Sequence, residues 1–180
     1  MPHFSLSAFG ADSPGIVAAV SGALGEQGCN LEDSTGTILR GHFALMLVVT
    51  APEGTTTGSL ERALSDVAER FDLVISIRQL THEAVGLATP DDAEPLTVSV
   101  HGADRPGIVR AISQALADDG GNVVELSTQL VEGGDAAVYV MTLRVLAQGG
   151  TGDTVADEVR RTAEGLGVQC TVRRDDADVL

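Results

Sequence analysis

The sequence has no tryptophan and no lysine, only two cysteines, and no long hydrophobic run. Its apolar runs, such as Phe43 to Val49, are far shorter than the roughly 20 residues that a membrane-spanning helix requires. Cys29 and Cys170 lie far apart, without the spacing of a zinc site or a disulfide scaffold, so we expect buried or half-buried free thiols. The N-terminus lacks the basic start and apolar stretch of a secretory signal, which predicts a cytoplasmic protein with no membrane partner.

Positive charge is also scarce. Every basic residue is an arginine, and 11 bases against 26 acids give a formal net charge of −15. Such a chain repels the phosphates of nucleic acid. The only adjacent basic pairs, Arg160-Arg161 and Arg173-Arg174, are flanked by acids, so we expect no direct contact with nucleic acid.

Residue groupings that support catalysis or cofactor binding are missing as well. The four histidines are scattered, without HxxH or HExxH spacing, at His3, His42, His82 and His101. Cys29 follows Gly28 at the expected C-terminal end of a helix, where the helix dipole raises the pKa of a thiol. The sequence contains no GxGxxG motif and no Walker loop. We therefore expect no metal, no cofactor and no enzymatic activity.

The chain repeats itself. The segment FGADSPGIV at residues 9–17 reappears as HGADRPGIV at residues 101–109, an offset of 92 (102 minus 10). At the same offset, without a gap, the two copies share Ala19/Ala111, Ser21/Ser113, Ala23/Ala115, Leu24/Leu116, Gly28/Gly120 and Asn30/Asn122. The sequence is therefore a tandem duplication.

Hydrophobic periodicity predicts the same element order in both copies. In the first copy we expect strands at 4–9, 31–39, 42–50 and 73–77, a helix from Pro14 that ends at Gly28, and a helix over 60–71. A tight turn at Arg40-Gly41 joins the middle strands. In the second copy we expect strands near 96–101, 123–131, 136–146 and 168–173, helices near 106–118 and 153–165, and a turn at 132–135.

The order βαββαβ predicts an α+β chain of two tandem ferredoxin-like domains, each an antiparallel four-stranded sheet with its helices on one face. We place domain 1 at residues 1–88, a proline- and acid-rich connection at 89–95, and domain 2 at 96–180. Such a sheet leaves an edge strand and one face uncovered, so we expect a homodimer.

The loops Gly10–Gly15 and Gly102–Gly107 are the predicted ligand sites. The backbone N–H groups of a helix N-terminus favour an anion such as a carboxylate. Asp12 and Asp104 beside them suit an ammonium group, and the amides of Asn30 and Asn122 can bind either end of a zwitterion. An alternative has equal weight at this point: the aspartates are turn or N-cap residues, and the asparagines favour a left-handed backbone.

The motif GADxPGIV, followed by a helix, a glycine and then an asparagine before an apolar residue, resembles the ACT-domain signature in both copies. Two such domains with little else resemble the glycine cleavage system transcriptional repressor family. The resemblance implies that an amino acid binds where ACT domains pair. It implies contacts from Asp12, Ser13, Pro14, Gly15, Ile16, Asn30 and Leu31, and from Asp104, Arg105, Pro106, Gly107, Ile108, Asn122 and Val123.

The first copy departs from the family pattern. Ser13 stands where the family usually has an arginine, which this sequence has only at Arg105, and Cys29 replaces a small or apolar residue. In the second copy Gly121 adds a second glycine before Asn122. The two sites are therefore not equivalent, and the second is the closer match.

Two functions follow from these observations. The first is a ligand-responsive regulator, in which a bound amino acid changes how the chain meets a partner protein. The second is a structural interaction module that binds no metabolite. ACT pairs are often attached to enzymes, but both copies together leave no sequence for a catalytic domain.

Overall fold

The chain forms two compact units, Met1–Ala88 and Thr89–Leu180, which we call module 1 and module 2. The computed structural model describes residues 1–81, 92–133 and 136–175. Residues 89–91 of the predicted connection, Gly134 and Asp135 of the predicted turn, and His82 lie outside these ranges. Among the described residues, no helix is long and apolar enough to cross a membrane.

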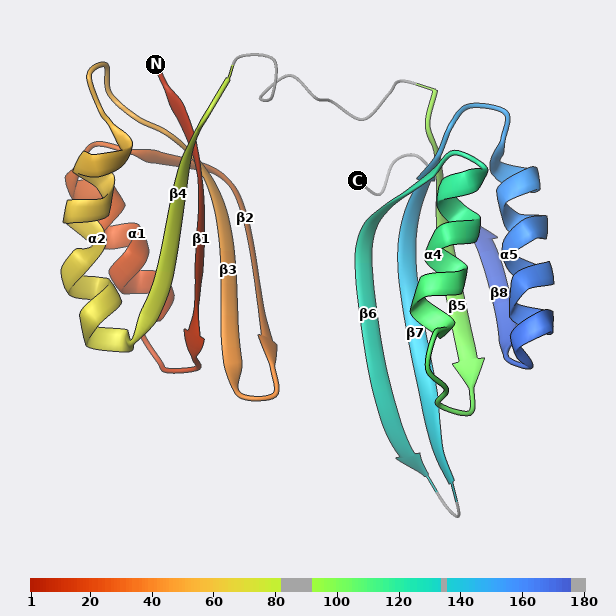
Figure 1. Cartoon of the computed structure of the whole chain (residues 1–180). Helices are drawn as coiled ribbons and strands as arrows, with labels where there is room; N and C mark the ends of the chain where they lie inside the picture. The colour runs from red at the N-terminus through yellow and green to blue at the C-terminus, as the bar shows by residue number, and fades with distance from the viewer. Residues whose placement is uncertain (82–91, 134–135, 176–180) are drawn as a thin grey trace. The chain divides into compact units, whose positions relative to one another are not determined.

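Module 1 has the predicted order βαββαβ (Figure 1). Its elements are β1 (His3–Ala11), α1 (Ile16–Glu26), β2 (Asn30–Leu39), β3 (His42–Thr50), α2 (Thr57–Phe71) and β4 (Leu73–Leu80). The strands form one sheet in the order β2-β3-β1-β4, and all pairs are antiparallel. Strand β2 is therefore an edge strand.

Module 2 repeats this topology. Its elements are β5 (Glu94–Gly102), α4 (Ile108–Asp118), β6 (Gly121–Gly133), β7 (Ala136–Ala147), α5 (Gly152–Leu166) and β8 (Gln169–Arg174). The sheet order is β6-β7-β5-β8, again antiparallel throughout. Both modules have the ferredoxin-like α+β fold that the sequence predicted.

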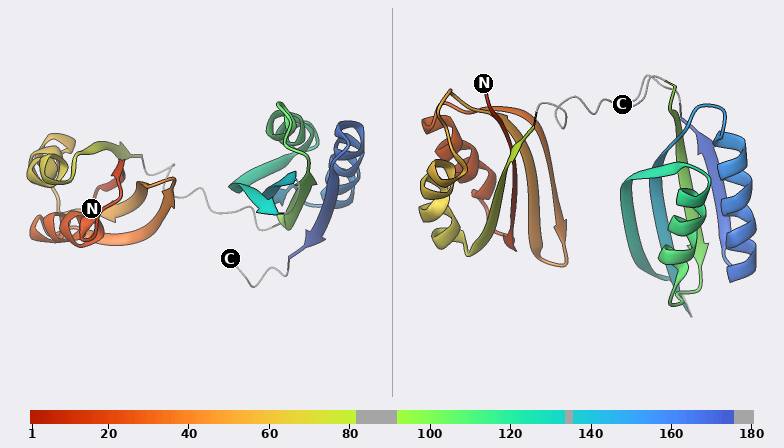
Figure 2. Two further views of the ribbon diagram at one scale, coloured as in Figure 1. Left: turned by 90° about the horizontal axis from the view of Figure 1, so that it is seen from below. Right: turned by 45° about the horizontal axis from the view of Figure 1, so that its top comes forward.

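In each module the two helices cover one face of the sheet, as the views of Figure 2 show. The alternation in β1 explains why: Phe4, Leu6 and Ala8 are buried against the helices, whereas Ser7 and Phe9 point to the other face. Each fully buried large side chain contributes about 1.5–3 kcal/mol relative to an exposed one. The second face of each sheet remains uncovered by its own module.

Both edge strands contain an irregularity at the same place. The pairing register of β2 with β3 shifts between Leu31 and Asp33, and that of β6 with β7 shifts between Val123 and Glu125. The residues involved are 92 apart in the sequence, so the duplication preserved the bulge as well as the strand. A bulge bends an edge strand and limits uncontrolled strand addition.

Several predicted boundaries were wrong by two or three residues, and three of them have a clear physical reason. Helix α1 begins at Ile16 rather than Pro14, and α4 begins at Ile108 rather than residue 106, because a glycine with left-handed backbone precedes each helix. Strand β5 begins at Glu94, inside the stretch that we expected to be a connection. The Glu94 carboxylate accepts a hydrogen bond from Gly150 N at 2.6 Å and pairs with Arg174 at 3.5 Å, which holds the strand start in place.

Candidate ligand site

The loop between β1 and α1 is held in place at both ends. Asp12 N donates to Gly41 O at 2.9 Å, which fastens the loop to the β2–β3 turn. At the other end Gly15 is the N-cap of α1 with φ 99°, a conformation that a Cβ atom would strain. The Ile16 side chain is 2% exposed and lies in the core, so this residue offers only its backbone to a ligand.

The first backbone N–H groups of α1 have no acceptor within the helix. The first helical bond runs from Ala19 N to Gly15 O at 2.9 Å, which leaves the N–H groups of Ile16, Val17 and Ala18 without an intrahelical acceptor. No side-chain hydrogen bond caps α1. The reading of Asp12 as an N-cap is therefore wrong, because Gly15 occupies that position.

A hollow of about 450 Å³ lies over this loop. It is lined by Asp12, Ser13, Gly15, Ile16, Val17, Ala18 and Phe43. The lining combines one exposed carboxylate, one hydroxyl and the start of a helix with the apolar surface of Val17 and Phe43. It can accommodate an anion at the helix start, a cation at Asp12 and a small apolar group beside Phe43.

Phe43 lines this hollow, although it lies outside the loop motif on which the predicted site was based. Phe43 lies on β3 opposite Gly10 of β1, and Tyr139 lies on β7 opposite Gly102 of β5. The two aromatic residues therefore hold equivalent places in the two modules. Only the cross-strand register brings them beside the loops, since both are more than 25 residues away along the chain. In the sequence, the only indication of this position was an aromatic residue shortly after the turn that joins the two middle strands of each module.

The loop of module 2 has the same backbone but different side chains. Gly107 is the N-cap of α4 with φ 96°, no side-chain hydrogen bond caps the helix, and the first helical bond runs from Ala111 N to Gly107 O. Asp104 is therefore not an N-cap either. Arg105 Nη1 donates to Leu166 O at 3.2 Å, at the C-terminal end of α5. Arg105 thus ties the loop to α5, whereas Ser13 in module 1 has no guanidinium for this bond.

Tyr139 replaces the apolar ring of Phe43 with a phenol in module 2. Burial raises the pKa of Tyr139, a hydrogen bond with Thr128 lowers it, and the negative charge of Asp104 raises it further. These influences place the phenol within electrostatic reach of the loop aspartate. The two loops therefore differ in polarity: module 1 presents a hydrocarbon ring where module 2 presents a hydroxyl group.

Asn30 and Asn122 lie at the opposite end of each sheet from the loops. Asn30 pairs with Thr50, which in turn pairs with His3 at the start of β1, whereas Asp12 follows the end of that strand. At about 3.3 Å per residue, the two ends of β1 are roughly 26 Å apart. The clamp that we predicted from Asp12 and Asn30 is therefore not assembled inside one module.

The alternative reading of the asparagines is wrong too. Asn30 and Asn122 have strand backbone, and the left-handed conformation belongs to the preceding glycines, Gly28 with φ 73° and Gly120 with φ 81°. Leu31 and Val123, the next residues, pack against the cores of their modules. Both asparagine side chains are exposed and so remain available for binding.

Asn122 borders a separate hollow of about 470 Å³. Its other lining residues are Asp92, Ala93, Gly120, Leu146, Ala147, Gln148 and Gly149. A Cβ atom on Gly149 would lie 2.8 Å from Asp92 O, so this position requires glycine. Asn122 was a predicted site residue, whereas the β7–α5 loop beside it was not.

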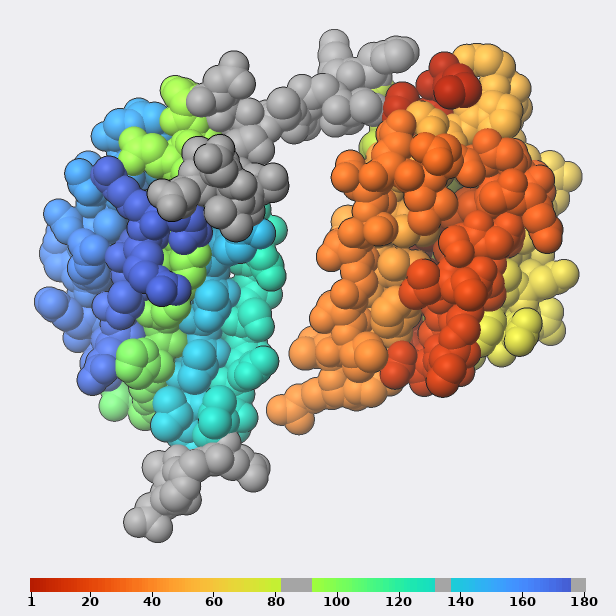
Figure 3. Space-filling model, turned by 180° about the vertical axis from the view of Figure 1, so that it is seen from behind, coloured from red at the N-terminus to blue at the C-terminus, as the bar shows by residue number. Residues whose placement is uncertain are grey.

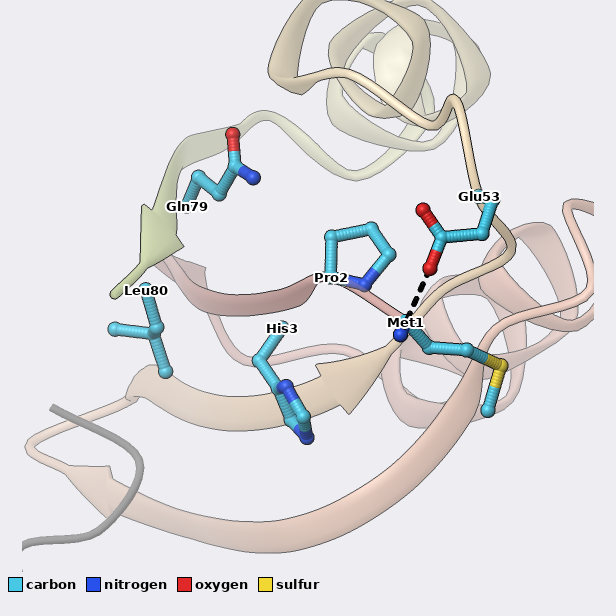
Figure 4. Close-up of a pocket in the computed structure, with 6 residues that line it drawn as sticks. All are labelled: Met1, Pro2, His3, Glu53, Gln79 and Leu80. Atoms are coloured by element: carbon cyan, nitrogen blue, oxygen red, sulfur yellow. Dashed lines mark ion pairs between the residues drawn. The ribbon is translucent and has the colours of Figure 1, made fainter. Parts of the chain in front are cut away.

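A smaller hollow, of about 230 Å³, lies where β1 begins (Figure 4). The close-up shows the Met1 amino group directed at Glu53, with which it forms an ion pair at 2.9 Å. A hydrogen bond with that amino group, together with its charge, lowers the pKa of Glu53. His3 pairs with Glu32 at 3.3 Å. The charged groups here already have partners, so this hollow is a weaker candidate than the loop.

Metal and thiol chemistry have little support in the described part of the chain. No three histidine, cysteine or acidic residues described by the structure are grouped so that they could hold a metal ion. Both cysteines are free, as predicted. Burial raises the pKa of the Cys29 thiol, and burial also raises that of Cys170 although the charge of Arg160 lowers it. A protonated thiol is a poor nucleophile.

Comparison with known proteins agrees with this architecture. Residues 3–78 match the ACT domain family. The UPF0237 protein of Methanopyrus kandleri is 35% identical over 86 residues, which are 47% of this chain and 92% of that protein. The glycine cleavage system transcriptional repressor of Escherichia coli K12 is 29% identical over 126 residues, which are 69% of this chain and 63% of that protein.

Solved structures match across both modules. A protein of Galdieria sulphuraria, described as unknown, has a TM-score of 0.81 and 27% identity and covers 97% of this chain and 99% of its own. A putative glycine cleavage system transcriptional repressor shares the fold, with a TM-score of 0.69, 18% identity, and coverage of 97% and 98%. The chain therefore has an ACT domain at residues 3–78, and on its identity to the Methanopyrus kandleri protein over 92% of that protein it belongs to the UPF0237 family.

Proposed function

We propose that this chain is a non-catalytic regulator that binds a free amino acid at the β1–α1 and β5–α4 loops. The observation that carries the proposal is repeated in both modules: a helix starts at a left-handed glycine, no side chain caps it, and an exposed aspartate lies next to it. Positive and negative binding elements lie side by side, which suits a zwitterion better than a phosphate or a hydrocarbon.

The three parts of an amino acid find separate partners in this arrangement. Its carboxylate accepts hydrogen bonds from the N–H groups of Ile16 and Val17, its ammonium group pairs with Asp12, and its side chain packs against Phe43. In module 2 the corresponding groups come from Ile108, Asp104 and Tyr139. We propose that module 1 prefers an apolar or small side chain and that module 2 accepts a polar one.

The position of the asparagines supports binding where two modules pair. Because Asn30 lies at the opposite end of β1 from Asp12, one module cannot supply both groups to one ligand. Two modules that meet edge to edge in antiparallel fashion would bring the loop of one to the asparagine of the other. A ligand shared in this way stabilises the paired state, and that pairing is the regulatory signal.

The regulated partner is proposed from relatives alone. Two of the relatives are named glycine cleavage system transcriptional repressors, so we propose that the chain controls gene expression or metabolism through a partner protein. The strongly acidic composition argues against direct contact with nucleic acid. A homodimer and a cytoplasmic location remain predictions of the sequence.

A thermal-shift screen of the full chain against the twenty amino acids tests this proposal. A ligand at 100 times its Kd stabilises the folded state by about 2.7 kcal/mol, which raises the Tm by several degrees. We expect a selective rise that is lost in Asp12→Asn or Asp104→Asn. Asp66→Asn, the same charge change on the exposed surface of α2, should keep it. If none of the twenty shifts the Tm, the chain is instead a structural interaction module.

A further inference from the structure

The uncovered face of the module 1 sheet carries large apolar side chains. We call this surface the open face of module 1; it consists of the residues of β1 to β4 that point away from α1 and α2. On it Phe9 is 52% exposed, Met46 60% and Val74 73%. Such exposure of three large side chains on one sheet face is typical of a surface that a partner covers.

The register arranges the open face of module 1 in rows that cross the sheet. The first row contains Thr37, Ala44, Phe9 and Val74, in the strand order β2, β3, β1, β4. The second row contains Thr35, Met46, Ser7 and Ser76, and the third contains Asp33, Val48, Ser5 and Arg78. In each row a larger side chain on one central strand pairs with a smaller one on the other, and the third row has an acid at one edge and a base at the other.

The corresponding face of module 2 is different in character. Figure 3 shows this face, with β6 in teal, β7 in cyan, β5 in green and β8 in blue side by side. Its central row consists of hydroxyl residues, Ser127, Thr142, Ser99 and Thr171. Its acid, Glu125, already pairs with Arg144 of the adjacent strand at 3.4 Å. In module 1, by contrast, neither Asp33 nor Arg78 forms an ion pair with a described residue.

A two-fold axis parallel to the strands makes the open face of module 1 complementary to itself. Such an axis places β1 above β3 of a second copy and β4 above β2, without changing the row. Phe9 then faces the small Ala44 of the second copy, and Met46 faces Ser7. Arg78 faces Asp33, and the symmetry creates this ion pair twice. We propose that the open face of module 1 binds the same face of a second copy of the chain.

The dimensions of the face are adequate for this contact. Four strands at about 4.8 Å spacing and nine residues at about 3.3 Å give roughly 600 Å² per copy, or about 1,200 Å² in total. That value is at the lower end of specific protein interfaces. The strands of two aligned sheets cross at about 30°. One row away from the crossing point, this angle displaces a row sideways relative to its partner row in the second copy by about 3.5 Å, which is less than one strand spacing. The row contacts therefore persist on either side of the crossing point.

This contact is separate from the proposed ligand sites. It uses the face of the sheet, whereas the ligand uses the loops and the edge carrying Asn30. The face can pair in a chain that binds no amino acid, and a ligand can bind to a chain whose faces do not pair. Failure of the dimer test would therefore leave the ligand proposal intact, and failure of the ligand test would leave the dimer proposal intact.

Charge reversal with a mixing test examines the dimer directly in the full chain. Asp33→Arg places two arginines opposite each other, and Arg78→Asp places two aspartates opposite each other. We expect each variant alone to dimerise at least about tenfold more weakly by sedimentation velocity at low salt. An equimolar mixture should restore the dimer, because both cross pairs are then opposite in charge. The double variant Asp33→Arg/Arg78→Asp should dimerise by itself.

Two controls make the outcome decisive. Asp33 and Arg78 lie three strands apart in their own sheet, about 14 Å, so each variant should keep the wild-type unfolding midpoint at concentrations too low for dimers to form. Arg173→Asp, the same reversal on the third row of module 2, should leave the dimer unchanged. The proposal is overturned if the wild type is monomeric at tens of micromolar, if the single variants stay dimeric, or if mixing them restores nothing. Loss of the dimer in Arg173→Asp would instead point to module 2 as the partner.

Discussion

The guanidinium group of Arg105 donates a hydrogen bond from Nη1 to the main-chain oxygen of Leu166, at 3.2 Å. Leu166 ends α5, where the helix dipole leaves partial negative charge on the last carbonyl groups. Arg105 therefore connects the proposed ligand loop of module 2 to the C-terminal end of a helix. In the family resemblance this arginine is a ligand contact, but its observed contact is structural.

Arg105→Ala should accordingly lower stability more than it lowers ligand affinity. We expect the free energy of unfolding of module 2 to fall by about 0.3–1 kcal/mol, because a cation at a helix C-terminus contributes that amount. Urea denaturation measures it. Arg110→Ala, which removes an exposed arginine from the side of α4, is the matched control. A tenfold loss of ligand affinity with unchanged stability would show that Arg105 leaves Leu166 and binds the ligand.

The glycine at the start of α1 should be indispensable for the loop. Gly15→Ala places a Cβ atom on a residue with φ 99°, which costs about 1–2 kcal/mol. Gly22→Ala is the control, because Gly22 lies within α1 with open space around it. That change should stabilise the helix by up to about 1 kcal/mol. Thermal unfolding of both variants gives the comparison, and equal Tm changes would contradict it.

The aromatic position on the third strand should set which side chain each loop prefers. Phe43→Tyr adds a hydroxyl to the module 1 hollow, and Tyr139→Phe removes one beside Asp104. We expect Tyr139→Phe to lower the affinity of module 2 for a polar amino acid by about fivefold, since one hydrogen bond contributes about 1 kcal/mol. Isothermal titration against one apolar and one polar amino acid measures the preference. If neither exchange alters it, these residues do not line the sites.

Stability should decline in alkaline solution through the buried thiol of Cys29. Burial raises the pKa of Cys29 above its ordinary 9.0, so the folded state holds the proton that the unfolded state releases. This contribution is fully present below pH 9.0 and is lost as the pH rises through the higher folded-state pKa. Urea denaturation from pH 7 to 10 should show a shallower decline in Cys29→Ala than in wild type. Parallel curves would mean that Cys29 does not contribute to the pH dependence.

The elements and their order were predictable from the sequence because they depend on neighbours along the chain. The alternation of Phe4, Leu6 and Ala8 is a property of one strand, and the stop at Gly28 is a property of one helix end. The repeat with its offset of 92 then implied that the second copy has the same helices and strands in the same order as the first. Errors were limited to ends, where Gly15 and Glu94 took positions that only their hydrogen bonds and backbone angles define.

The composition of the candidate site was only partly predictable. The loop residues Asp12 to Ile16 are adjacent in sequence and stay together, so the motif located them. We expected Asn30 near the loop because it follows the same helix, but a helix that crosses a sheet returns the chain to the opposite end of the neighbouring strands. Phe43 was not predicted because it is far from the loop in the sequence. In the sheet it pairs with Gly10 of β1 and therefore lies beside the loop.

The sequence by itself determined the duplication, the βαββαβ order and the acidic charge, because each follows from residue type and local spacing. Only the tertiary structure decided which distant residues lie together: Arg105 with the end of α5 at Leu166, and, through the strand register, Phe43 with the loop and Asp33 in one row with Arg78. The physical reason is that cross-strand register has a period of two, and a slip of one residue moves every side chain to the other face. Register is set by the packing of the whole sheet against its helices.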